Sequence, residues 1–316
     1  MDYQVLISEM TSSFVICTKN RLQDLLTCVD SIRDQTVLPK ELVIVDAGNI
    51  KDIENIIRCR LTDSNIKFIY QKAEPSTARQ RNIGVKLASG EIILFVDDDV
   101  ILERNYHEKI LEVYKKHEGP YLGGVCGTIA NAGEFVETPF MKMFRRLFLL
   151  NHHTIKGRSM FLPSGHYVFV AYPETVIEVE AMESCRSSYY RHVFNKYNFD
   201  DSWPGYSICE DLELSYRISR KYKQYQTPYA RLIHKRSPVS RLKTYELQRL
   251  YVINHFLMFN KNISKNVINI SAFVWSRIGD AVINIGRSIV RRDRAYIAGY
   301  MCGIKEIIVK LCSVKI

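Results

Sequence analysis

The feature that most constrains the fold of this chain is an apolar run that leads directly into three acidic residues. Glu91–Val96 (EIILFV) shows no alternation of apolar and polar positions, and Asp97, Asp98 and Asp99 follow it at once. A strand that is apolar on both sides must be buried on both faces, as the central strands of parallel sheets are. The run therefore predicts an α/β domain whose helices cover both faces of a sheet.

Strand and helix patterns alternate around this run. The other predicted strands are Phe14–Cys17, Glu41–Asp46 (ELVIVD), Lys67–Tyr70, part of Gly119–Gly133 and Arg231–Ile233. Helical spacing of apolar residues predicts helices over Leu22–Ile32, Ile53–Ile57, Ala78–Leu87 and Ser187–Phe194, and another opening at Cys209. His152–Gly165 is expected to be a mobile loop. This order predicts a Rossmann-like, mixed but mainly parallel sheet, with ligands beyond the carboxyl ends of the strands.

Charge divides the chain into two predicted regions. Residues 241–316 hold 13 of the 44 Lys and Arg residues but only 4 of the 34 Asp and Glu residues, so this last quarter carries nearly all of the net charge of +10. We therefore predict a neutral domain over residues 1–240 and a basic helical appendage over residues 241–316.

The appendage is expected to be amphipathic. An apolar stripe at helical spacing comprises Val267, Ile270, Val274, Ile278, Ala281, Ile285 and Ile289, and a polar stripe beside it comprises Arg277, Asp280, Asn284, Arg287 and Arg291. A second helix is predicted over residues 296–311. Two interpretations stay open: these helices pack on the domain, or they lie on an anionic membrane surface.

Location is predicted from three further patterns. No apolar segment approaches the roughly 20 residues that a membrane span requires, and Met1–Met10 has two acidic and no basic residues, unlike a signal peptide. The eight Cys residues include no C-x-x-C pair, which favours reduced thiols. We expect a cytoplasmic protein, with a peripheral position on the inner face of the membrane as the open alternative. Because the basic residues are spread along helices without aromatic platforms, no nucleic acid is expected as a partner.

The aspartate triplet is the strongest candidate for chemistry. Buried carboxylates are costly unless a cation compensates them. In a strand Asp97 and Asp99 point to the same side, and two hard oxygen ligands there suit Mg²⁺ or Mn²⁺ holding a diphosphate. The alternative is a solvated acidic turn that merely ends the strand.

Other candidates flank the triplet. Asp46 ends another buried strand and should open onto the same rim, where it either contacts a nucleobase or ribose or caps a loop. Arg79, Arg81 and Asn82 lie on the preceding predicted helix, and one or more could pair with diphosphate or orient the aspartates. The alternative for these three is an ordinary exposed helix face.

Two later positions complete the candidate set. Glu210 and Asp211 open a helix, where carboxylates cap the positive end of the dipole, or where one of them acts as a general base. His234 is either structural or a third metal ligand or phosphate contact. Lys235 and Arg236 place positive charge close after it, which suits a diphosphate leaving group.

The order of these segments resembles family 2 glycosyltransferases of the GT-A fold. The resemblance covers about residues 12–240 and rests on an ordered set of motifs: V-I-C-T-K-N-R, V-I-V-D (43–46), A-R-Q-R-N-I-G (78–84), G-E-I-I-L-F-V-D-D-D (90–99), E-D-L-E-L-S-Y-R (210–217) and the later His234. It implies a GT-A nucleotide-diphospho-sugar transferase fold with a C-terminal basic helical appendage. It also implies an inverting transfer of sugar from a nucleotide-diphosphate donor to a saccharide or lipid-linked acceptor hydroxyl.

The resemblance also implies residue roles. Asp46 would match the aspartate that recognises the base, and Asp97 and Asp99 the DxD motif that serves nucleotide and metal, with Asp98 near the ribose. Asp211, or less readily Glu210, would match the catalytic base. His234 would match the histidine often found near metal or diphosphate.

One segment departs from the family pattern, and two other functions are weighed against a glycosyltransferase. Where the family usually carries a Gly-x-Asn type turn, this chain has Glu183–Ser188 (ESCRSS), in which Arg186 could make an unusual contact. A sugar nucleotidyltransferase is disfavoured because the loop Thr18–Arg21 lacks glycine. A catalytically silent nucleotide- or membrane-binding protein would have no use for the separate acidic motifs.

Overall fold

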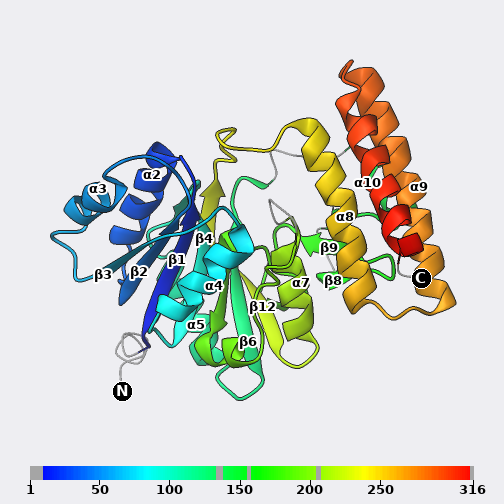
Figure 1. Ribbon diagram of the computed structural model, residues 1–316. Coiled ribbons are helices and arrows are strands. Elements are labelled where there is room, and N and C mark those ends of the chain that lie inside the picture. Colours follow the sequence, from blue (N-terminus) through cyan, green and yellow to red (C-terminus); the bar gives the residue numbers. More distant parts are fainter. Residues whose placement is uncertain (1–9, 133–137, 155–157, 204–207, 314–316) are drawn as a thin grey trace.

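The computed structural model describes residues 10–132, 138–154, 158–203 and 208–313. Of the segment Met1–Met10 considered above, only Met10 belongs to the described residues. A central sheet flanked by helices occupies one side of the molecule, and three long helices at the C-terminal end occupy the other (Figure 1).

The central sheet has nine strands and is mixed but mainly parallel, as predicted. Its order is β10-β12-β6-β11-β4-β1-β2-β3, with β5 also paired to β12. Strands β3, β2, β1 and β4 lie side by side and run parallel to one another, and β6 is parallel to β12. The strands are β1 (Ser12–Thr18), β2 (Glu41–Asp46), β3 (Lys67–Lys72), β4 (Ile92–Asp97), β5 (Val100–Leu102), β6 (Leu122–Ile129), β10 (Ile177–Glu178), β11 (Ser187–Tyr190) and β12 (Lys223–His234).

Helices cover both faces of this sheet. They are α2 (Leu22–Arg33), α3 (Ile53–Arg60), α4 (Thr77–Leu87), α5 (Tyr106–Lys116) and α7 (Glu210–Ser219). Phe14 packs edge-on against His107 of α5, whereas the next residue, Val15, lies so close to Gly84 of α4 that a Cβ there would clash with it. Since successive strand residues point to opposite faces, α5 and α4 lie on opposite sides of the sheet.

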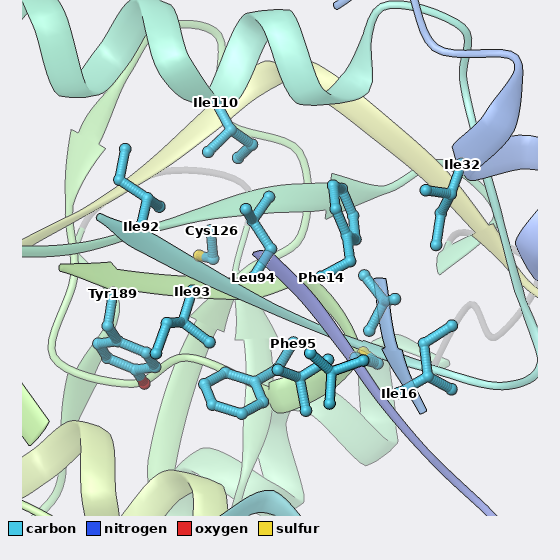
Figure 2. Close-up of a cluster of buried hydrophobic side chains, with 14 of the residues drawn as sticks. Phe14, Ile16, Ile32, Ile92, Ile93, Leu94, Phe95, Ile110, Cys126 and Tyr189 are labelled. Atoms are coloured by element: carbon cyan, nitrogen blue, oxygen red, sulfur yellow. The ribbon is translucent and has the colours of Figure 1, made fainter. Parts of the chain in front are cut away.

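The buried core follows the same alternation along β4. Figure 2 shows Ile92 and Leu94 directed toward Ile110 of α5, and Ile93 and Phe95 toward the opposite face with Tyr189. The residues of the apolar run are buried on both faces, which is the environment that their composition predicts.

Two predictions about the middle of the chain are wrong. In the helix predicted over Ser187–Phe194, residues 187–190 instead form strand β11, because they fill the position between β4 and β6 and pair antiparallel with both; a short 3-10 helix, η3 (Arg191–Asn195), follows it. Within the range 152–165 predicted as a loop, β7 (His152–Thr154) and β8 (Met160–Phe161) pair with β9 (Tyr167–Val170) in a small second sheet; residues 155–157 of that range lie outside the described residues. For β11, pairing with strands that are distant in the sequence overrides the local pattern; in the small sheet the paired segments are close in the sequence.

The C-terminal helices are α8 (Thr244–Asn262), α9 (Val267–Val290) and α10 (Ala295–Ser313). Trp275 of α9 contacts Leu147 at the end of α6 (Pro139–Leu147) and stacks on Phe148. The middle of the polar stripe of helix α9 faces inward, whereas Arg287 and Arg291 at its end are exposed. Arg277, Asp280 and Asn284 are buried, whereas Val274, Ile278 and Ile285 are about half exposed (52%, 48% and 47%). No described helix combines the length and the apolar character needed to cross a bilayer.

Candidate active site

The acidic residues predicted from strand ends lie at one edge of the central sheet. Asp97 is the register partner of Cys17, and Asp46 the partner of Thr18. Because β2, β1 and β4 are parallel neighbours, their carboxyl ends meet at this edge. Strand β12 ends there too, since His234 pairs with Val100 at the start of β5.

Asp97, Asp99 and His234 form one cluster. Each offers a ligand atom, and these atoms lie within 4.8 Å of one another; His234 Nε2 is 3.1 Å from Asp99 Oδ1 and 4.0 Å from Asp97 Oδ2. Apart from His234 Nε2, the buried Asp99 Oδ1 has no hydrogen-bonding neighbour in the described part of the chain. Two carboxylates and an imidazole, with their ligand atoms this close together, make a donor set that fits Mn²⁺ or Mg²⁺.

Burial and neighbouring charged groups shift the pKa values of the two aspartates in this cluster. Burial raises the pKa of Asp97, although the Arg81 guanidinium and His234 oppose the shift. Burial also acts to raise the pKa of Asp99, but His234, the Ser237 N–H and Arg21 outweigh it, so that this pKa is lowered.

Asp98 is bonded to the loop that follows β1. Its carboxylate accepts hydrogen bonds from Thr18 Oγ1 (2.7 Å) and from the Arg21 guanidinium (3.0 Å). Burial raises the pKa of Asp98 to about 6 against the effect of Arg21. Asp98 thus ties the loop after β1 to the end of β4.

Asp46 lies at the same edge but is fully buried. Its carboxylate accepts hydrogen bonds from the Gly48 N–H (2.6 Å), the Tyr70 hydroxyl (2.8 Å) and the Lys72 ammonium (2.6 Å). Protein donors therefore occupy both carboxylate oxygens, and Asp46 does not belong to the cavity wall described below.

The Glu210–Asp211 pair begins helix α7 as predicted, and its two members have different surroundings. Glu210 is buried and forms an ion pair with Arg81, which also lies 3.5 Å from Asp97. Burial raises the pKa of Glu210, with Arg81 opposing. Asp211 forms no ion pair with the described residues; its Oδ2 accepts hydrogen bonds from the Ser184 N–H (2.9 Å) and Oγ (3.1 Å).

One cavity of about 580 Å³ lies between the end of β4 and the beginning of α7. Its wall includes Asp97 and Asp98 from the end of β4, and Arg81, Glu210 and Asp211 from α4 and α7. Residues of the loop after β1 and of the segment that leads into α8 complete the wall: Thr18, Lys19, Arg21, Ser240 and Leu242. Acidic segments more than 100 residues apart in the sequence therefore face the same space.

The remaining predicted residues, including the metal-ligand candidates Asp99 and His234, are not part of this cavity wall. Asn82 exchanges hydrogen bonds with the backbone of Phe199, and Arg79 is exposed near Asp201 (4.0 Å). Lys235 pairs with Asp24 (2.5 Å). Arg236, which adopts φ of 54°, is also absent from the wall.

Segment Glu183–Ser188, which contains no glycine, contributes one cavity residue that the sequence did not predict. Ser184 lines the cavity and fixes the Asp211 carboxylate, whereas Arg186 binds Glu183 and the Gly127 carbonyl (2.8 Å) away from it. Arg21 was also missed as a site residue. The signal available for Arg21 was its place directly after the first buried strand, at the edge where Asp97 and Asp46 were expected.

Comparison with known families gives one match. The model of glycosyl transferase family 2 matches residues 13–170, half of the chain. This span includes the aspartate triplet and ends before Glu210 and His234.

Relatives match a similar part of the sequence. An uncharacterised glycosyltransferase of Rickettsia bellii is 26% identical over 147 residues, which are 42% of this chain and 20% of that protein. Glycosyltransferase GlyG of Streptococcus pneumoniae is 27% identical over 125 residues, 39% of this chain and 42% of GlyG. The chain therefore spans less than half of the length of either relative.

A solved structure extends the likeness to nearly the whole fold. GalNAc-T7, determined with UDP, GalNAc and Mn²⁺, superposes with a TM-score of 0.59 at 15% identity, covering 96% of this chain and 57% of GalNAc-T7. At this identity the likeness concerns the fold alone, and it confirms the predicted GT-A architecture with added C-terminal helices.

Proposed function

This chain belongs to glycosyl transferase family 2, and from that membership we propose that it transfers a sugar from a nucleotide-diphosphate donor, with inversion, to a hydroxyl of a saccharide or lipid-linked acceptor. The observation that carries the proposal is the shared cavity, in which the end of β4 and the beginning of α7 meet. Donor diphosphate would lie toward the β4 end, and the acceptor hydroxyl toward Asp211.

Asp211 is the better candidate for the base. It forms no ion pair with the described residues, and Ser184 holds its carboxylate at the cavity wall. Glu210 is paired with Arg81, so its role in the proposal is to fix that guanidinium beside Asp97. Asp211 would take the proton of the acceptor hydroxyl as the oxygen attacks the anomeric carbon and the diphosphate leaves.

Asp97, Asp99 and His234 would hold the divalent cation, which when bound supplies positive charge for the departing diphosphate. Arg81 and Arg21 add fixed positive charge on the same side. For Asp46 we propose an indirect part in base recognition, since its carboxylate fixes Lys72 and the Gly48 turn.

The products distinguish this proposal from a sugar nucleotidyltransferase. Incubation with a panel of nucleotide sugars, Mn²⁺ and candidate acceptors is expected to release nucleoside diphosphate, measured by phosphorus NMR. Pyrophosphate formed from a sugar phosphate and a nucleoside triphosphate would instead establish the nucleotidyltransferase.

The inverted helix α9 supports a membrane-associated acceptor. Burying Arg277, Asp280 and Asn284 while leaving an apolar stripe in water is unfavourable, at roughly 25 cal/mol for each Å² of apolar surface left exposed. Exposed apolar side chains also lie on α6, and the C-terminal quarter carries the net positive charge of the chain. We therefore propose that α9 rests on an anionic bilayer, peripheral on the inner face of the membrane.

The double substitution Ile278→Glu/Ile285→Glu tests this surface. Each side chain is about half exposed, so losing both from the bilayer is expected to cost about 2 kcal/mol, a roughly 30-fold loss of partitioning. Flotation with vesicles of phosphatidylcholine and phosphatidylglycerol measures it. Asn65→Glu/Gln71→Glu adds the same charge at exposed positions around β3; equal recovery of the two double variants would contradict the membrane surface.

A further inference from the structure

The carboxylate of Asp211 is hydrogen-bonded at both of its oxygens. Ser184 donates to Oδ2 through its N–H and its hydroxyl, and the Leu212 N–H donates to Oδ1 (2.8 Å). Two donors fill the two acceptor positions of Oδ2, whereas Oδ1 accepts a single hydrogen bond from the described residues. Oδ1 is therefore the oxygen that can still take up a proton, and the two bonds from Ser184 fix the direction in which it faces.

The turn that carries Ser184 is itself fixed to the central sheet. It is a short buried 3-10 helix, η2 (Ser184–Arg186). The Arg186 side chain donates to the Gly127 carbonyl of β6 (2.8 Å), and the Arg186 carbonyl accepts the Tyr106 hydroxyl of α5 (3.1 Å). Ser184 therefore offers its two donors from a rigid support, which is what precise placement of a reacting group requires.

The backbone that leads into Asp211 also needs support. Cys209, which precedes the Glu210–Asp211 pair, has φ of 71° and ψ of 10°, in the left-handed region. A residue with a Cβ rarely adopts this conformation, and it persists only where the surrounding structure imposes it. The contacts made by the residue before Cys209 therefore matter for the position of the pair.

Asn254 of α8 makes such a contact. Its side chain is fully buried, and its Nδ2 donates to the Ile208 carbonyl (3.1 Å). Its Oδ1 has no hydrogen-bond partner among the described residues. A buried amide with an unused oxygen destabilises a fold, and an apolar side chain of similar size would avoid that cost. The bond to Ile208 gives a physical reason for an amide at this position.

Helix α8 thus contributes to the active site from beyond residue 240. Leu247, in its first turn, lines the same cavity as Ile208, Cys209 and Asp211. Asn262, about two turns after Asn254, donates to Glu213 of α7 (3.3 Å), which is not part of the cavity wall. Of these two contacts from α8, only that of Asn254 adjoins the cavity.

We propose that Ser184 and Asn254 are positioning residues for the general base. Ser184 fixes the carboxylate of Asp211, and Asn254 fixes the backbone from which that carboxylate projects. The inference rests on the proposed function and adds that the basic C-terminal region supplies part of the catalytic geometry. Both residues act through Asp211, so their effects depend on its carboxylate.

Double-mutant cycles with Asp211→Asn, made in the full chain, test this dependence. The measured rate is the release of nucleoside diphosphate, with the nucleotide sugar and acceptor that give the highest turnover in the panel described above. Ser184→Ala and Asn254→Ala are each expected to lower kcat roughly tenfold or more, as misalignment of a reacting group does, with little change in KM for the donor. Added to Asp211→Asn, each should lower kcat by less than about twofold, because the group that it positions no longer acts.

Two matched variants control for the loss of a buried hydrogen bond. Ser188→Ala removes a hydroxyl of the same segment that donates to the Val125 carbonyl (2.7 Å), outside the cavity wall. Asn262→Ala removes the other contact of α8 with α7. Both should keep kcat close to that of the unsubstituted protein. Melting temperatures show which variants fold, and if Asn254→Ala does not, Ser184→Ala decides, since its backbone N–H still holds Asp211.

The outcomes separate this inference from the proposed function. Equal fold losses of kcat with and without the Asp211 carboxylate would overturn the inference, because the two residues would then act on the fold or directly on the substrate. Losses in the control variants as large as those in Ser184→Ala and Asn254→Ala would overturn it too. If Asp211→Asn is impaired while folded Ser184→Ala and Asn254→Ala are not, the inference alone fails. If no nucleotide sugar releases nucleoside diphosphate, or Asp211→Asn keeps near-normal kcat, the proposed function itself fails.

Discussion

Substituting Asp211 by Asn is expected to lower kcat by roughly 10²–10⁴-fold, the usual contribution of a general base. The amide oxygen can still accept the hydrogen bonds that Ser184 donates to Asp211, so the cavity should keep its shape. The amide cannot take up the proton of the acceptor hydroxyl. Affinity for nucleoside diphosphate should therefore remain close to that of the unsubstituted protein while turnover at saturating donor and acceptor falls.

Glu210→Gln is the matched control at the neighbouring carboxylate. Because Glu210 is buried against Arg81, its neutralisation leaves a buried guanidinium with less compensation, at a cost of about 3 kcal/mol in the free energy of unfolding. We expect Glu210→Gln to be mainly a stability defect and Asp211→Asn mainly a loss of kcat. Near-normal kcat in Asp211→Asn, or a larger kcat loss in a folded Glu210→Gln, would show that the base is assigned to the wrong residue.

Removal of divalent cations is expected to abolish transfer, and added Mn²⁺ or Mg²⁺ to restore it. Asp99→Asn replaces a buried ligand oxygen that has no hydrogen-bonding neighbour among the described residues apart from His234, so it should weaken Mn²⁺ binding by on the order of 100-fold, about 2.7 kcal/mol. Electron paramagnetic resonance of free Mn²⁺ measures this without any substrate.

Asp98→Asn serves as the comparison for the cation site. Asp98 is bonded to Thr18 and Arg21 and is not part of the Asp97–Asp99–His234 cluster. The Asp98→Asn variant should bind Mn²⁺ nearly as well as the unsubstituted protein, even if its affinity for the donor falls. An unsubstituted enzyme that is fully active in excess chelator would refute the cation's role.

The sequence predicted correctly which residues lie at the same edge of the sheet, because the course of the backbone alone determines this. An apolar run that ends in aspartates predicts a buried strand of a parallel sheet, and parallel strands end at one edge, so Asp97 and Asp46 could be placed together in advance. Which way each side chain turns there was not predictable. Tyr70 and Lys72 come from β3, and it is these donors that occupy the Asp46 carboxylate.

Contacts between segments far apart in the sequence explain why strand β11 and the orientation of α9 were not predicted. Residues 187–190 carry no strong strand signal, yet the gap between β4 and β6 makes them a strand. For α9 the two stripes were visible in the sequence, but apolar stripes usually face inward. Here α9 packs against His166, which accepts a hydrogen bond from Arg277 and lies 3.6 Å from Asp280. The part of the polar stripe from Arg277 to Asn284 is therefore buried. We retain residue 240 as the proposed boundary between the two regions.

We propose a single-displacement transfer in which Asp211 activates the acceptor opposite the leaving diphosphate. Proton NMR of the first-formed product, recorded before any anomeric equilibration, distinguishes inversion from retention. The expected product has an anomeric configuration opposite to that of the sugar in the nucleotide donor. A product that retains the donor's configuration would contradict the single displacement.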